Sequence, residues 1–289
     1  MSATRILFLA KYRVPHACFA LKWDHNLIGI DRTIVASPVP QADLWRVFDK
    51  YGIDTSCFSY INDNEIYQRY PQVNNWVFAD DYRGPWLKQQ AIKLSYLDLL
   101  DEDVMLMHDC DTFMIEPYQC VKDGRLNFMA LLNTTQGSYN RVFESITGLD
   151  KITPHCFVTE LVPVKKEHFQ KLLNLLQQRW PDKHWLDAII DAVPGLPTVP
   201  PWGNGNIIKW FSEYEMLGNW AVHCESVEFT QQRRFEYDSL DKIGELDPSK
   251  YNAVCDAIPD LSLSMQMRWD TLDIPRYDQY LSTVKAIAP

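Results

Sequence analysis

The fold of this chain is decided by Gly84-Pro-Trp86-Leu-Lys-Gln-Gln90-Ala-Ile-Lys93-Leu94 and the run that follows it, Val104-Met-Leu-Met-His-Asp109-Cys-Asp111. Pro85 suits the first turn of a helix, where its missing N–H has no partner to lose. Trp86, Gln90 and Lys93 recur at helical spacing and share one face. The apolar residues 104–107 predict a buried strand, which the chain leaves through two aspartates. A helix that leads into such a strand is typical of an α/β fold.

The two aspartates are the candidate metal ligands. Side chains two residues apart in a strand point the same way, so Asp109 and Asp111 can reach one cation together. Open α/β sheets bind ligands at the carboxyl ends of their strands. Mg2+ and Mn2+ take oxygen ligands and keep positions for water and phosphate. The pattern therefore predicts Mn2+, or Mg2+, gripping a diphosphate. The competing interpretation is a pair of solvated turn aspartates.

Composition narrows the class of protein. The 289 residues are 46% hydrophobic and 23% charged, as in an ordinary globular protein. The net charge of -10 argues against a nucleic-acid binder, which needs a basic face. No apolar stretch approaches the length of a membrane span, and residues 6–10 are too short for a signal-peptide core. With seven scattered cysteines and no zinc spacing, we expect a cytoplasmic protein without a transmembrane segment, for which peripheral membrane contact stays open.

The order of elements predicts a sheet flanked by helices. Besides the two decisive segments, we expect strands over 5–10, 33–36, 56–60 and 126–132, and helices over 41–51, 166–180 and 184–193. Neither a Gly-x-Gly-x-x-Gly fingerprint nor a P-loop is present, so a nucleotide would be held by a metal and side chains. We find no linker and no internal repeat, and we treat the chain as one domain.

A second group of polar residues lies in Ser212-Glu213-Tyr-Glu215-Met-Leu-Gly218. We expect this segment to belong to a helix over 206–217 that Gly218 caps. Partial burial raises the pKa of a glutamate and suits it to general-base work, which makes Glu213, and then Glu215, candidate catalytic residues. His223 is a candidate third ligand for Mn2+. The alternative interpretations are solvated carboxylates and a structural histidine.

These motifs, taken in this order, resemble a bacterial family of the GT-A class of nucleotide-sugar glycosyltransferases over residues 5–225. The resemblance implies a GT-A-like, Rossmann-type mixed sheet flanked by helices. It implies a nucleotide-sugar-binding half over 1–117, an acceptor half over 118–225 and a C-terminal lid or tail over 226–289. It also implies a divalent cation, usually Mn2+, with Asp109 near the ribose and the metal, and Asp111 and His223 on the metal.

The activity that follows is transfer of a sugar from a nucleotide-sugar donor, such as a UDP-sugar, to a glycan or glycolipid acceptor in bacterial surface polysaccharide synthesis. The cation would neutralise charge on the departing diphosphate. We expect donor binding by Trp86, Gln90, Lys93 and Asp109. Arg233 or Arg234, from a C-terminal lid, would add positive charge. Whether the reaction retains or inverts the anomeric configuration stays open.

Two alternatives use other chemistry. A phosphatase of the haloacid-dehalogenase type would use Asp109 as its nucleophile, although the fifth position of that motif is Phe113 rather than Thr or Val. A non-catalytic carbohydrate-binding protein would account for the aromatic content of 13%. It would not account for a lysine helix that leads into two aspartates.

Overall fold

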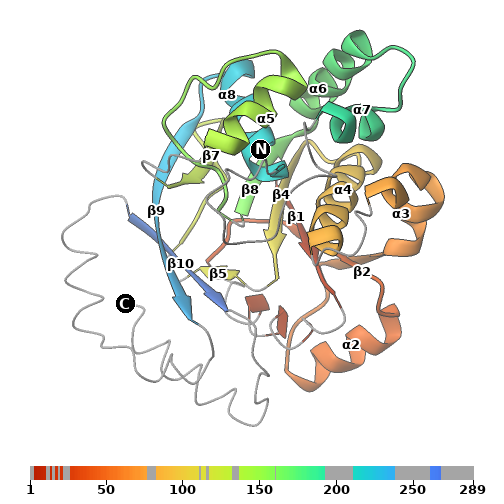
Figure 1. Cartoon of the computed structure of the whole chain (residues 1–289). Helices are drawn as coiled ribbons and strands as arrows, with labels where there is room; N and C mark the ends of the chain where they lie inside the picture. Colours follow the sequence, from red (N-terminus) through yellow and green to blue (C-terminus); the bar gives the residue numbers. More distant parts are fainter. Residues whose placement is uncertain are drawn as a thin grey trace.

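The computed structural model describes residues 3–10, 14, 17–18, 20–21, 27–76, 83–110, 112–114, 117–131, 137–159, 161–192, 211–237 and 261–267. Within them the chain forms two five-stranded sheets with helices packed around them (Figure 1). Both sheets contain parallel and antiparallel pairs of strands. The expected mixed α/β fold is confirmed.

The first sheet carries the decisive strand, β4, between two neighbouring strands. Its strands are β1 (Thr4–Phe8), β2 (Arg32–Ser37), β3 (Phe58–Asn62), β4 (Val104–Asp109) and β8 (Leu161–Lys165). Their order is β3-β2-β1-β4-β8, and only β8 runs antiparallel to its neighbour in this sheet. The first four match expected strands. Strand β8 was not expected, because Pro163 and Lys165 interrupt its apolar pattern.

Helices cover both faces of this sheet because its strands are apolar on both sides. Ile6 and Phe8 pack into a cluster with residues of α4 (Arg83–Leu99). Leu7, from the opposite side of the same strand, packs into a second cluster with residues of α2 (Gln41–Lys50). The side chains of β1 alternate between the two clusters, as the pleat of a strand requires. A strand buried on both faces is typical of an α/β sheet.

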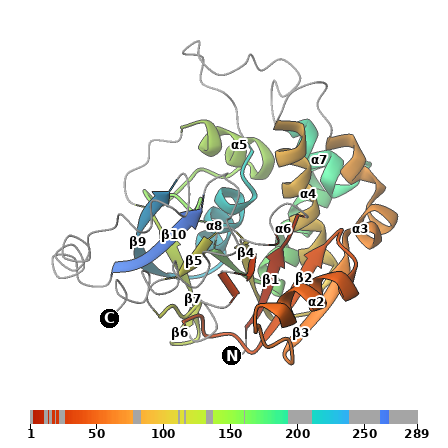
Figure 2. The same ribbon diagram turned by 90° about the horizontal axis from the view of Figure 1, so that it is seen from below.

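The second sheet lies beside the first (Figure 2). Its strands are β5 (Thr112–Met114), β6 (Val121–Lys122), β7 (Arg125–Ala130), β9 (Glu228–Tyr237) and β10 (Leu261–Met267), in the order β5-β10-β9-β7-β6. Strand β9 pairs in parallel with β7 and with β10. Residues 228–237, which we expected in a C-terminal lid with Arg233, therefore form a strand of this sheet, and the lid stays a prediction. The polar run Thr230-Gln-Gln-Arg-Arg234 hid a central strand.

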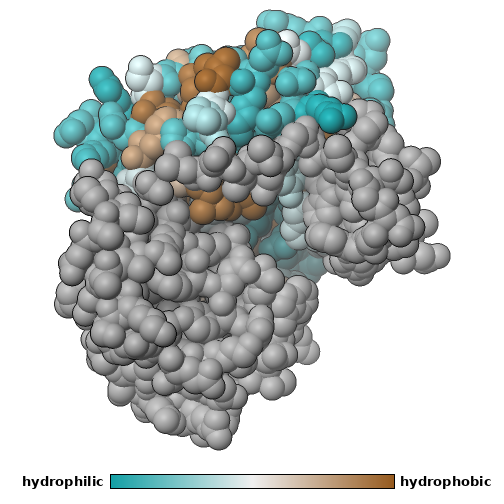
Figure 3. All heavy atoms as spheres, turned by 60° about the vertical axis from the view of Figure 1, so that its left-hand side comes forward, coloured by the Kyte–Doolittle hydropathy of each residue, from teal (hydrophilic) through white to brown (hydrophobic). Residues whose placement is uncertain are grey.

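The remaining helices complete the layers. They are α3 (Asp63–Arg69), the 3-10 helix η2 (Pro71–Trp76), α5 (Gly137–Thr147), α6 (Lys166–Arg179), α7 (Trp185–Ala192) and α8 (Glu213–Cys224). The helices expected over 166–180 and 184–193 are confirmed as α6 and α7. No helix in the described ranges is both long and apolar enough to cross a membrane. In the space-filling view the coloured face is mostly hydrophilic, with smaller groups of apolar residues (Figure 3).

Candidate functional site

Asp109 stands where the sequence places it, at the carboxyl end of β4. In the parallel pair of β1 and β4 it lies opposite Phe8, the last residue of β1. The carboxyl ends of neighbouring parallel strands meet there, which is the edge at which open α/β sheets bind ligands. Asp109 keeps 21% of its side-chain surface exposed. Asp111 lies outside the described residues.

Lys93 reaches Asp109 from α4. Its Nζ lies 2.6 Å from Oδ1 of Asp109 and 2.8 Å from Oε1 of Glu213, and it donates a 2.7 Å hydrogen bond to the hydroxyl of Tyr214. The side chains of Lys93 and Glu213 are both buried. One ammonium group therefore joins the end of β4 to the first turn of α8. We call Lys93, Asp109, Glu213 and Tyr214 the lysine network.

The charged groups in this network shift one another's pKa values. Burial by itself lowers the pKa of Lys93, but the carboxylates of Asp109 and Glu213 outweigh it and raise that pKa above its ordinary value. Burial raises the pKa of Glu213, against the opposing effect of Lys93 and with the charge of Asp109 adding to the rise. Lys93 is thus held as an ammonium ion between two acidic groups that compete for it.

The first turn of α8 is held by side chains from two elements. The Oγ of Ser212 accepts a 3.3 Å hydrogen bond from the N–H of Glu215, as an N-cap residue does. The Oε1 of Gln90, one turn before Lys93 on α4, accepts a 3.0 Å hydrogen bond from the N–H of Glu213. The expectation that Gln90 and Lys93 share a face is confirmed, and that face meets the start of α8. Gln90 here binds protein backbone.

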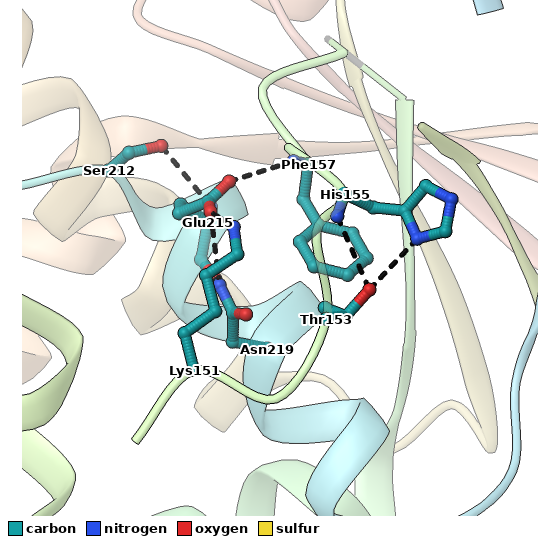
Figure 4. Close-up of polar contacts among 7 residues, drawn as sticks. All are labelled: Lys151, Thr153, His155, Phe157, Ser212, Glu215 and Asn219. Carbon is teal, nitrogen blue, oxygen red and sulfur yellow. Dashed lines mark hydrogen bonds and ion pairs between the residues drawn. The ribbon is translucent and has the colours of Figure 1, made fainter. Parts of the chain in front are cut away.

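Glu215 anchors a loop rather than facing an open surface (Figure 4). Its Oε2 accepts a 2.7 Å hydrogen bond from the N–H of Phe157, and its Oε1 accepts hydrogen bonds from Lys151 and, at 3.1 Å, from Asn219. The side chain is 1% exposed. These bonds tie the segment from Lys151 to Phe157 onto the first turns of α8.

His155 lies on that same loop. Its Nδ1 is 2.8 Å from the Oγ1 of Thr153 (Figure 4), and its ring stacks on Phe229 of β9 with the two ring centroids 4.0 Å apart. Burial lowers the pKa of His155, and the charge of Lys151 lowers it further. His155 therefore joins the loop to the second sheet as a neutral ring.

Both candidate bases are buried against protein partners. Glu213 is 3% exposed, and its Oε1 holds Lys93. Glu215 holds Lys151 and the Phe157 backbone. A general base must reach the proton that it removes. Protein partners occupy both oxygens of Glu215, whereas the general-base role of Glu213 stays a prediction.

His223 lies away from Asp109. It is near the end of α8, with Nε2 2.8 Å from the carbonyl oxygen of Asp150 and its ring stacked on Phe143. Ten residues of helix separate it from Glu213, a rise of about 15 Å. The structure does not bring the imidazole to the lysine network, so the expectation that His223 shares a metal with Asp109 is not met.

The expected cap at Gly218 is also wrong. Helix α8 runs through Gly218 to Cys224. A Cβ added at Gly218 would lie 2.1 Å from the ring of Phe157, so the glycine is required by close packing rather than by a helix end. Residues 206–210, which the expected helix included, lie outside the described residues.

Two further expected donor-binding residues are placed only in part. Trp86 is half-buried and packs against the main core. Arg233 pairs with Leu263 across the β9–β10 ladder, and its side chain is not among those described.

Tyr214 and Lys151 were not expected at all. The sequence Glu213-Tyr214-Glu215 could have indicated such partners. Polar side chains at a helix start need hydrogen-bond partners when they are buried.

Comparisons with known proteins concern architecture alone. No protein-family model and no curated protein matches this chain. Among solved structures it is similar to the galactosyltransferase LgtC in complex with donor and acceptor sugar analogs, with 10% identity over 99% of this chain and 96% of that one, at a TM-score of 0.45. It is also similar to apo mouse xyloside xylosyltransferase 1, with 8% identity over 81% of this chain and 88% of that one, at a TM-score of 0.47. We base the functional proposal on the residues of this chain.

Proposed function

We propose that this chain is a metal-dependent glycosyltransferase that moves a sugar from a UDP-sugar, or a similar nucleotide-sugar, to a hydroxyl group of a glycan or glycolipid. The sequence resemblance to a bacterial GT-A family supports this activity and its place in surface polysaccharide synthesis. One structural observation carries the proposal: Asp109 ends a central parallel strand and is held there by Lys93, whose ammonium group is anchored on Glu213.

The Asp109 carboxylate suits a hard divalent cation. Lys93 contacts Oδ1, and the partly exposed side chain leaves a second oxygen for a metal ion. Mn2+ and Mg2+ prefer such oxygen ligands. Asp109, together with Asp111 from the sequence motif, would hold the ion. Once bound, the cation would neutralise negative charge on a diphosphate leaving group.

The other residues of the lysine network have positioning roles in this proposal. Lys93 fixes the orientation of Asp109, and Glu213 fixes Lys93, in the way that outer partners orient metal ligands. Glu215 holds the loop from Lys151 to Phe157 in place. We assign no general-base role to Glu215.

Binding of UDP together with Mn2+ tests the proposal. Asp109→Asn removes the anionic oxygen, so we expect loss of Mn2+-dependent UDP binding in calorimetry. It should also lose the stabilisation against urea that a ligand at 100 times its Kd gives, about 2.7 kcal/mol. The matched control is Asp101→Asn, an exposed aspartate just before the same strand, which should bind like the wild type.

Equal UDP binding by the wild type and Asp109→Asn, with and without Mn2+, would contradict the proposal. Incorporation of an acyl-phosphate mimic at Asp109 would favour the phosphatase alternative instead. Slow Mn2+-dependent hydrolysis of a UDP-sugar by the wild type, absent in Asp109→Asn, would rule out a protein that only binds carbohydrate.

A further inference from the structure

A second group of ligating side chains lies at the other end of the first sheet. Glu167 and His168 begin α6, and Glu225 follows the last residue of α8. One ligand atom from each lies within 4.8 Å of the others. Lys165, next to this group, pairs with Val104, the first residue of β4, whereas Asp109 is the last. The length of β4, about 17 Å, therefore separates this group from Asp109.

His168 is the unusual member of the group. It is 3% exposed, and within the described part of the chain its Nδ1 has no hydrogen-bond partner. Its Nε2 is directed at both carboxylates, 3.6 Å from Oε1 of Glu167 and 3.8 Å from Oε2 of Glu225. His168 thus places one ring nitrogen between two carboxylates at distances too long for hydrogen bonds, and this arrangement calls for an explanation.

The separations match ligands that share one zinc ion. Two ligands at Zn–N and Zn–O distances of about 2.0–2.2 Å in a tetrahedron lie about 3.3–3.6 Å apart. The Nε2 contacts are too long for hydrogen bonds and close to that spacing.

Neighbouring residues fit a supporting role. The Nζ of Lys165 lies 2.6 Å from Oε1 and 2.7 Å from Oε2 of Glu225, so Lys165 can keep Oε1 while a metal takes Oε2. Hydrogen bonds of that kind orient carboxylate ligands. The indole N–H of Trp220 donates a 2.7 Å hydrogen bond to the carbonyl oxygen of His168 and holds the backbone of that ligand in place.

We propose that Glu167, His168 and Glu225 bind one Zn2+ ion, with water as the fourth ligand, in a structural site that joins the start of α6 to the end of α8. Nitrogen and oxygen ligands in this number favour Zn2+ over Mg2+. This site is independent of the proposed glycosyltransferase activity, since Asp109 contributes nothing to it.

The test uses the full chain after removal of metals with a chelator. We titrate Zn2+ against a colorimetric competitor in excess Mg2+, and we measure the melting temperature with and without Zn2+. The wild type should bind one Zn2+ and melt higher with it. His168→Gln and Glu167→Gln should each bind Zn2+ at least about tenfold more weakly. His184→Gln, the same change at a half-buried histidine before α7, is the control and should bind like the wild type.

Unchanged Zn2+ affinity in both Glu167→Gln and His168→Gln would overturn the proposal, as would the lack of one-to-one binding by the wild type. If His168→Gln does not fold, Glu167→Gln decides, because that side chain is 63% exposed and its change does not disturb the core. Asp109→Asn should keep the Zn2+ affinity of the wild type. This result separates failure of the zinc site from failure of the proposed activity.

Discussion

Lys93 is a buried ammonium group shared by Asp109 and Glu213. The helical spacing of α4 predicted that Lys93 shares a face with Gln90, and the buried strand predicted the position of Asp109. Neither predicted Glu213 as the second partner. Removing one member of a buried ion pair is costly because it leaves an uncompensated charge, whereas neutralising both members is not.

Lys93→Met should therefore lower the free energy of unfolding by about 3–5 kcal/mol. Adding Glu213→Gln should restore part of this loss, because the carboxylate left without Lys93 is then neutral. Urea unfolding of the two single variants and the double variant measures the coupling. Lys171→Met changes an exposed lysine of α6 and should stay within about 0.5 kcal/mol of the wild type. A Lys93→Met protein as stable as this control would contradict the assignment.

Asp63 makes stability depend on pH in a particular direction. Burial raises its pKa, against the lowering effect of the 2.8 Å hydrogen bond from the hydroxyl of Tyr96. The folded state thus holds the proton more tightly than the unfolded state. The protonated carboxyl stabilises the fold below the ordinary pKa of 3.8, and this contribution is lost as the pH rises through the raised value.

Asp63→Asn removes that titration and keeps an oxygen for Tyr96. Relative to the wild type, the variant should gain stability as the pH rises from 3.8 through the raised pKa of Asp63. Urea unfolding at several pH values measures this difference. A difference that is constant over that range, or that shifts in favour of the wild type, would contradict the pKa direction.

Among the elements, α8 departs most from expectation. The sequence suggested a helix that ended at Gly218, because glycine after an apolar run is a common C-terminal signal. The helix instead begins at Glu213 and passes Gly218, where the ring of Phe157 lies too close for any Cβ. A glycine can mark the end of a helix or a close contact with another element. Only the position of the neighbouring loop shows which of the two applies.

Gly218→Ala tests this reading of α8. Alanine is favoured over glycine in a helix by about 1 kcal/mol, so a cap-free helix would be stabilised. Overlap with Phe157 should instead destabilise the protein by about 1–3 kcal/mol. In a double-mutant cycle by urea unfolding, Phe157→Leu should reduce the cost of Gly218→Ala. A stabilised Gly218→Ala protein would show that the contact with Phe157 is not restrictive.

Across the chain, the second sheet depends on strands far apart in sequence. Phe128 of β7 lies opposite Phe229 of β9, and Thr230 donates a 2.9 Å side-chain hydrogen bond to Asn127. The expected lid at 228–237 is part of this sheet. The sequence of β9 is too polar to predict a strand. The strand forms because β7 and β10 pair with it on either side.

Hydrogen exchange distinguishes the strand from a lid. Without any ligand, the amides of residues 228–231 should exchange as slowly as those of residues 127–130, because the β7–β9 ladder protects both. Mass spectrometry of peptides from the two segments measures this. Fast exchange at 228–231 that slows only when UDP and Mn2+ are added would support a lid instead.

Local sequence was enough to place Asp109 at the end of a buried strand and to put Gln90 and Lys93 on one helix face. Helix and strand periodicities follow from backbone geometry over a few residues, so they can be read without the rest of the chain. Three-dimensional packing settled which groups meet Lys93, why Gly218 is required, and that residues 228–237 form a central strand. Those outcomes depend on contacts between elements far apart in the sequence, whose approach is governed by burial and shape and leaves no periodic pattern in the chain.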